Sequence, residues 1–176
     1  GTLQQSAGDL LLVTHGTGDA TVVNNAAIDF GTSNVGGNLS ATASAGTITQ
    51  AGGALQVAGT SAFTTSTADQ VITLGNTGNA LGGTVAFTTG GTTGNVTIDN
   101  GTTALDFAAS TISGTLTATG GAAAGIVDSG NVVVAGDVTL TTDDNNGVIN
   151  AGTLQQSAGD LLLVTHGTGD ATVVNN

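Results

Sequence analysis

The chain has 176 residues, of which 30 are glycine, 39% are hydrophobic and only 7% are charged. All twelve acidic residues are aspartate, and the absence of lysine and arginine gives a formal net charge of −12. Without basic side chains, cysteine or an apolar run of about 18 residues, the chain is not expected to bind nucleic acid, form disulfides or thiolate metal sites, or insert into a membrane.

Short strand signals follow one another along the chain. Runs of four to seven residues rich in Val, Thr and Leu are bounded by Gly, Asn or Asp, which is the pattern of strands and turns. Examples in chain order lie within residues 9–15, 20–25, 27–31, 38–44, 54–59, 70–75, 84–90, 95–101, 115–121, 131–136 and 137–143. No stretch of fifteen or more residues has a helical pattern, and strands do not alternate with helices. The pattern therefore predicts an all-β chain.

Many of these segments alternate apolar and polar residues with a period of two. Leu39, Ala41 and Ala43 fall on one side of their segment, as Val96 and Ile98 do on theirs. Such alternation indicates strands with one buried face and one solvent face. The small size of the inward residues predicts a narrow interior, and glycine and asparagine suit its corners.

Two periods organise the sequence. Residues 1–25 recur without change at 152–176, so the chain holds one 151-residue unit (1–151) and the start of the next identical unit (152–176). A weaker repeat divides the unit into half-units of about 75 residues: Asp29-Phe30 matches Asp106-Phe107 at an offset of 77. We expect one continuous domain over residues 1–176, because tandem units that stack directly need no linkers.

A sandwich, a barrel and a solenoid of stacked β-coils are the candidate architectures. Regular periods, small interior residues and a directly following identical copy favour the β-solenoid. With about 20 residues per coil, 151 residues give roughly seven or eight coils and a rise of about 36 Å.

Residues 34–87 carry the pattern GNLxxTAxxGxIT … GALxVxGTxxFT … xITLxNxGNxxGGTVxF, and related stretches cover nearly the whole chain. This pattern resembles the repeats of filamentous-haemagglutinin-type adhesins, which are giant bacterial surface proteins exported by two-partner secretion. Similar repeats occur in autotransporter passengers. The resemblance implies a right-handed parallel β-helix that forms an elongated shaft outside an outer membrane.

Acidic and amide side chains crowd before a glycine in residues 142–147, TDDNNG, like a fragment of a calcium loop. If Ca²⁺ binds, Asp143, Asp144 and Asn145 are the predicted ligands; the EF-hand spacing and its terminal glutamate are missing. The stretch HGTGDATVV is similar to the calcium nonapeptide of β-rolls through Gly16, Gly18 and Asp19, but nonapeptides do not follow in tandem. No other cofactor is expected.

Catalysis is not expected. His15 and its copy His166 are the only imidazoles, and no nucleophile elbow or oxyanion-hole motif accompanies His15 and nearby Asp19. A polar residue at the end of a strand is the expected role of this histidine. Polysaccharide-degrading β-helices use clustered carboxylates, often with basic residues, whereas here the aspartates are scattered.

The sequence thus predicts a structural repeat of a long extracellular bacterial fibre, such as an adhesin shaft, a stalk or a biofilm filament. Its expected partners are further copies of the same repeat, with neighbouring fibres or cell-surface ligands as additional candidates. The alternative is a carbohydrate- or Ca²⁺-binding module of a secreted adhesin, and the last candidate is a polysaccharide-degrading enzyme.

Overall fold

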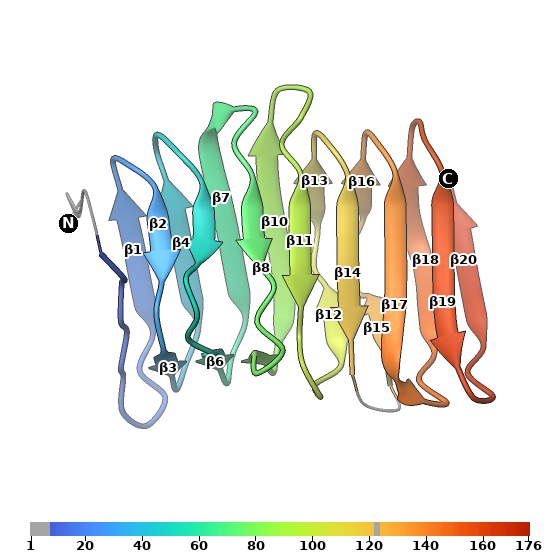
Figure 1. Cartoon of the computed structure of the whole chain (residues 1–176), viewed down its shortest axis with the longest axis horizontal. Helices are drawn as coiled ribbons and strands as arrows, with labels where there is room; N and C mark the ends of the chain where they lie inside the picture. The colour runs from blue at the N-terminus through green and yellow to red at the C-terminus, as the bar shows by residue number, and fades with distance from the viewer. Residues whose placement is uncertain (1–7, 122–123) are drawn as a thin grey trace.

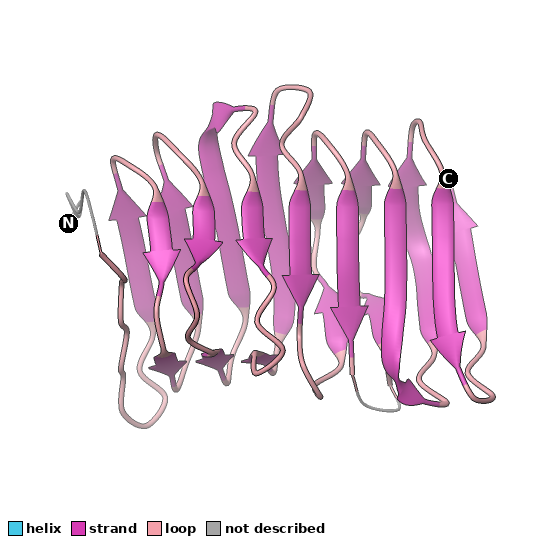
Figure 2. Cartoon of the chain, viewed as in Figure 1, coloured by secondary structure: helices cyan, strands magenta, loops and turns pink. Residues whose placement is uncertain are grey.

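The structure, a computed structural model, describes residues 8–121 and 124–176. All regular secondary structure in these residues is β-strand, and all strand pairings are parallel (Figure 2). Successive coils lie side by side along the long axis, and strands β1 (Ala20–Asn24) and β20 (Ala171–Asn175) lie toward opposite ends of the stack (Figure 1). The predicted β-solenoid is therefore confirmed.

The described strands form three sheets that run along the solenoid axis. The ten-stranded sheet contains β1 (Ala20–Asn24), β4 (Leu39–Ala43), β7 (Ser61–Ala68), β10 (Thr84–Gly90), β12 (Leu105–Phe107), β13 (Ser110–Ile112), β15 (Ile126–Asp128), β16 (Val132–Val134), β18 (Ile149–Gln156) and β20 (Ala171–Asn175). The seven-stranded sheet contains β2 (Ile28–Phe30), β5 (Ile48–Gln50), β8 (Ile72–Leu74), β11 (Val96–Asp99), β14 (Leu116–Gly120), β17 (Val138–Asn145) and β19 (Leu161–His166). The three-stranded sheet contains β3 (Ser33–Val35), β6 (Leu55–Val57) and β9 (Ala80–Leu81).

The period-two pattern places the apolar side chains inside the coils. In β4, Leu39, Ala41 and Ala43 are buried, while Ser40 is exposed and Thr42 is half-buried. In β11, the buried residues Val96 and Ile98 alternate with the half-buried residues Thr97 and Asp99. The predicted inward and outward faces of these strands are confirmed, and small residues such as Ala41 and Ala43 keep the interior narrow.

The four phenylalanines of the chain lie inside four successive coils. Ring centroids are 6.2 Å apart between Phe30 and Phe63, 5.7 Å between Phe63 and Phe87, and 6.2 Å between Phe87 and Phe107. These distances are in the range of favourable aromatic pairs. The rings therefore form a continuous aromatic column along part of the core.

The 151-residue offset corresponds to seven turns. Strands β1 and β20 have the same sequence, ATVVN, and lie in the same sheet. Seven pairing steps connect them, through β4, β7, β10, β12, β15 and β18. One turn thus takes about 22 residues, slightly more than the expected 20, and seven turns rise about 34 Å at the usual strand spacing.

The 77-residue offset moves a sequence motif to a different sheet. Strand β4 (LSATA) belongs to the ten-stranded sheet, whereas its counterpart β14 (LTATG) belongs to the seven-stranded sheet. Conversely, β2 (IDF) lies in the seven-stranded sheet and its counterpart β12 (LDF) in the ten-stranded one. A half-unit therefore spans about three and a half turns, and the solenoid presents related sequences on alternate faces.

The predicted strand within residues 9–15 is wrong for the first copy of the repeated segment and right for the second. Residues 10–15 make only isolated bridges, Leu10 with Phe30 and Val13 with Asn34, whereas the identical residues 161–166 form β19. The difference follows from position, because β19 pairs with β17 in the preceding coil. Residues 1–7 lie outside the described residues.

Candidate functional site

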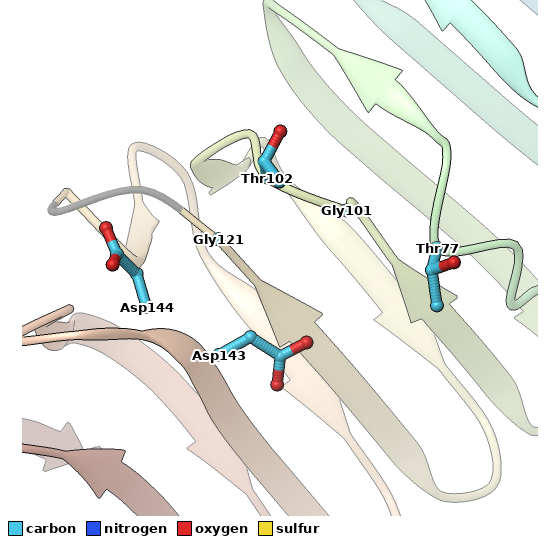
Figure 3. Close-up of a pocket in the computed structure, with 6 residues that line it drawn as sticks. All are labelled: Thr77, Gly101, Thr102, Gly121, Asp143 and Asp144. Atoms are coloured by element: carbon cyan, nitrogen blue, oxygen red, sulfur yellow. The ribbon is translucent and has the colours of Figure 1, made fainter.

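A cavity of about 390 Å³ lies along one edge of the solenoid. Its lining comes from four neighbouring coils, at the ends of β8, β11, β14 and β17: Thr77, Gly101, Thr102, Gly121, Asp143 and Asp144 (Figure 3). Gly101 has a φ of 56°, a left-handed conformation that glycine adopts without strain. The cavity is therefore a groove across consecutive corners, lined by threonine, glycine and aspartate residues.

The three predicted calcium ligands are only partly brought together. Asp143 and Asp144 line this cavity, but Figure 3 shows their carboxylates pointing in different directions. Asn145 lies beyond the lining residues, at the end of β17, in register with His166. In residues 8–121 and 124–176, no group of three or more His, Cys, Asp or Glu is placed to hold a metal ion. Calcium binding stays a prediction.

His166 ends β19, whereas its copy His15 lies outside the strands, two residues after the isolated bridge at Val13. His166 is exposed, and its Nδ1 is 2.6 Å from the carbonyl oxygen of Thr142 in the preceding coil. His15 is also exposed, and the Asp19 carboxylate near it accepts a hydrogen bond from the backbone N–H of Asn38 at 2.7 Å. The Asp19 carboxylate thus binds the next coil, as Asp and Asn side chains at other corners also do.

Side-chain oxygens of Asp and Asn connect the corners of successive coils. In each case an Oδ atom accepts a hydrogen bond from a backbone N–H about one turn later along the chain. The pairs are Asp19 with Asn38, Asn38 with Thr60, Asp69 with Thr92 and Thr93, Asn95 with Thr115, Asp106 with Ser129, Asp128 with Gly152 and Thr153, Asp137 with Asp160, and Asn146 with Thr168. We call this set the corner ladder. Scattered acids thus have a shared structural role in the stack.

The corner ladder does not stand out as a motif in the sequence. Its signal is an Asp or Asn at a corner, followed 19 to 25 residues later by a second corner. That spacing matches one turn of about 22 residues, so it becomes visible only when the length of a turn is known. The prediction that asparagine suits the corners is confirmed at Asn146, which has a φ of 68°.

Asp69 accepts more hydrogen bonds than any other residue of the corner ladder. One of its oxygens accepts from the N–H groups of Thr92 and Thr93 at 2.7 and 2.8 Å, beside Gly91 with its φ of 90°. The hydrogen bond from the Thr92 N–H, followed by those from Thr93, lowers the pKa of the Asp69 carboxyl. The Gly-rich turn 90–95 therefore uses its amides to hold a carboxylate of the same chain.

Replacing Asp69 by asparagine is expected to remove a pH-dependent contribution to stability. A carboxyl whose pKa is lowered by folding stabilises the protein above its unfolded pKa, and this contribution is lost as the pH falls through the folded pKa. Below about pH 4, wild type should therefore lose stability relative to Asp69→Asn, as measured by urea unfolding at a series of pH values. Asp144→Asn, with the same change in charge, is the control. A constant difference between wild type and Asp69→Asn from neutral pH to acid would contradict the assignment.

Two buried asparagines connect coils from inside the solenoid. The Asn79 side chain accepts from the N–H of Leu55 at 2.9 Å and donates to the carbonyl oxygen of Asp99 at 3.0 Å, which joins three successive coils. The Asn100 side chain accepts from the N–H of Leu81 at 2.8 Å and donates to its carbonyl oxygen at 3.1 Å. Because buried polar groups are costly without partners, these bonds fix the stacking register.

In residues 8–121 and 124–176 there is no helix long and apolar enough to cross a membrane. Two segments, residues 17–88 and 93–161, match a family described as "Repeats of unknown function" (DUF5649). Their first residues are 76 positions apart, close to the 77-residue offset of the half-units. No curated protein and no solved structure matches the chain.

Proposed function

We propose that the chain, which belongs to this family of repeats (DUF5649), is a structural repeat of a long extracellular bacterial surface fibre. The observation that carries the proposal is the return of an identical segment to the same sheet after seven turns. A unit with this property adds to the stack in a constant orientation. Repetition of the unit therefore lengthens a shaft without changing its direction.

The contacts between coils support a mechanical role. Parallel strand pairing, the aromatic column, the corner ladder and the buried asparagines all connect one coil to the next. Such contacts are local in a solenoid, so its stability grows with the number of coils. The net charge of −12 keeps neighbouring shafts apart.

The outer surface suits exposure outside a cell. The sequence has no lysine or arginine, so proteases of trypsin specificity have no cleavage site in it. The absence of cysteine removes any dependence on the redox state of the surroundings. The polar outward faces, rich in Thr, Ser and Asn, resemble in composition the adhesin repeats named above. We therefore place the repeat in an adhesin shaft, a stalk or a biofilm filament at the bacterial surface.

Immunogold labelling of intact source cells tests this proposal. Antibodies raised against the chain are expected to label thin filaments outside the cells without permeabilisation. Labelling of a cytoplasmic protein in the same preparation is the control for cell integrity. Labelling that appears only after permeabilisation, or that follows discrete globular particles, would contradict the proposed role.

A further inference from the structure

Residues 69 and 146 occupy equivalent corners of the two half-units. They are 77 positions apart, and they directly follow β7 and β17, whose burial patterns are identical. Asp69 has a φ of 62° and Asn146 a φ of 68°, and among the described residues no other non-glycine residue has a positive φ. The same left-handed corner therefore carries a carboxylate in one half-unit and an amide in the other.

Both corners offer hydrogen-bond donors to a side-chain oxygen. Oδ1 of Asp69 accepts from the N–H and the hydroxyl of Thr92 and of Thr93. Oδ1 of Asn146 accepts from the N–H of Thr168 at 2.8 Å and from its hydroxyl at 2.7 Å. Because hydrogen bonds to a carboxylate are stronger than those to a neutral amide, the corner at residue 146 suits an aspartate better than the asparagine that occupies it.

The residue after Asn146 is Gly147, and this pair of residues has a reaction of its own. The backbone nitrogen of the second residue can attack the side-chain carbonyl carbon of the asparagine, and glycine has no Cβ to obstruct the approach. The chain contains two such pairs, Asn100-Gly101 and Asn146-Gly147. The sequence alone does not distinguish them, whereas the structure does.

The pair Asn100-Gly101 is held in an unreactive arrangement. Asn100 is buried, and its Nδ2 donates to the carbonyl oxygens of Leu81 and Ala104 at 3.1 and 2.7 Å. The N–H of Gly101 donates to the Asp99 carboxylate at 2.8 Å. The amide that would leave and the nitrogen that would attack are thus both bound, and freeing the side chain would leave buried polar groups without partners.

Asn146 lacks these restraints. Its side chain is exposed, and among the described residues none accepts a hydrogen bond from its Nδ2. The N–H of Gly147 donates to the carbonyl oxygen of Asp144 at 3.1 Å, and this bond of the exposed corner is the one that must open. The two bonds from Thr168 polarise the side-chain carbonyl and stabilise the oxyanion that forms when the nitrogen attacks.

We propose that Asn146 is a self-modification site, at which the folded chain converts asparagine to aspartate with water as the only other reactant. The Gly147 nitrogen forms a bond to Cγ of Asn146 and gives up its proton, while the bond from Cγ to Nδ2 breaks and ammonia leaves with that proton. Water then adds to Cγ of the cyclic imide, the bond from Cγ to the Gly147 nitrogen breaks, and this nitrogen regains a proton. Because Thr168 polarises Cγ and not the backbone carbonyl, aspartate forms in preference to isoaspartate.

The product fits the corner ladder. Its carboxylate accepts the same two bonds from Thr168, as the carboxylate of Asp69 accepts those of its threonines. The chemistry does not depend on the proposed fibre, but in such a fibre it adds one negative charge to each 151-residue unit with age. The two ideas fail separately, because a fibre can form whether or not Asn146 is converted.

Timed incubation of the purified full chain at mildly alkaline pH tests the proposal, with Asn100 as the control in the same molecule. A protease that cleaves before aspartate releases residues 99–105 and residues 144–159, and mass spectrometry measures the conversion of amide to acid in each. Aspartate at position 146 creates a new cleavage site within the second peptide, whereas isoaspartate does not.

Conversion at Asn146 is expected to exceed conversion at Asn100 by at least about tenfold, because the buried hydrogen bonds of Asn100 must break before its side chain can react. Equal conversion of the two residues, or no conversion at Asn146, would overturn the proposal. Isoaspartate as the main product would also overturn it, since the corner would then not direct the attack of water.

Two substitutions separate the assigned roles. Gly147→Ala obstructs ring closure and is expected to slow the conversion at least about tenfold. Thr168→Val removes one of the two donors at similar size and should slow it several-fold, whereas Thr73→Val, on the exposed face of β8, should have no effect. Circular dichroism checks that the variants keep the β-solenoid. An unchanged rate in Gly147→Ala would show direct hydrolysis by water, and an unchanged rate in Thr168→Val would show that the corner does not assist; either result overturns the assignment.

Discussion

Replacing Phe87 by alanine is expected to lower the free energy of unfolding by about 3–5 kcal/mol. The ring is fully buried in β10, stacks on Phe63 with 5.7 Å between centroids, and contacts Phe107 at 6.2 Å. Its removal leaves a cavity that the neighbouring strands cannot close, because both coils beside it are fixed by strand pairing. Urea unfolding followed by circular dichroism measures the change.

Val133→Ala is the matched control for Phe87→Ala. Val133 is an exposed residue on the outward face of β16, and its truncation should change stability by no more than about 0.5 kcal/mol. A loss below about 1 kcal/mol for Phe87→Ala would mean that the aromatic column contributes little to the stack. In that case the strand ladders and the corner hydrogen bonds would have to carry most of the stability.

The all-β solenoid could be predicted because its signals are local and repeated. Alternation in residues 39–43 fixes the inward face of β4, and the recurrence of residues 1–25 indicates tandem stacking. Very short strands such as β3 and β9 are too brief for a period-two pattern to identify. The burial of Ser61 is also not predicted by the pattern. Ser61 occupies an inward position with its hydroxyl unpaired, whereas the corresponding residue of the other half-unit is Val138.

The corner ladder could not be predicted because it depends on which corners meet. Asp69 and Thr92 are 23 residues apart, and their contact requires a turn of that length at that point in the stack. For the same reason, the sequence does not show that the two half-units are offset by half a turn. An offset of 77 residues reveals that β4 resembles β14, but only the number of residues per turn places them in different sheets.

Part of the candidate site could be predicted from the sequence. Asp143 and Asp144 are distinguished by their crowding before Gly147, and both line the cavity at the strand ends. The other lining residues come from three earlier coils, which a local motif cannot include. A groove across coils is a property of the stacking, and its residues have no pattern within any single coil.

A chain lengthened by one further 151-residue unit is expected to form a single straight rod about 34 Å longer, with the same width. The added unit completes seven turns, so its first coil continues the ladders of β19 and β20 in the same sheets. The lengthened chain should also unfold at higher urea concentration, because the two end coils become a smaller part of the whole.

Electron microscopy of the parent and lengthened chains, with small-angle X-ray scattering for the mean length and cross-section, measures the increment directly. A uniform rod that gains about 34 Å per unit at constant cross-section is the predicted result. Two separate globules joined by a flexible segment, or a cross-section that grows with each added unit, would contradict a continuous solenoid.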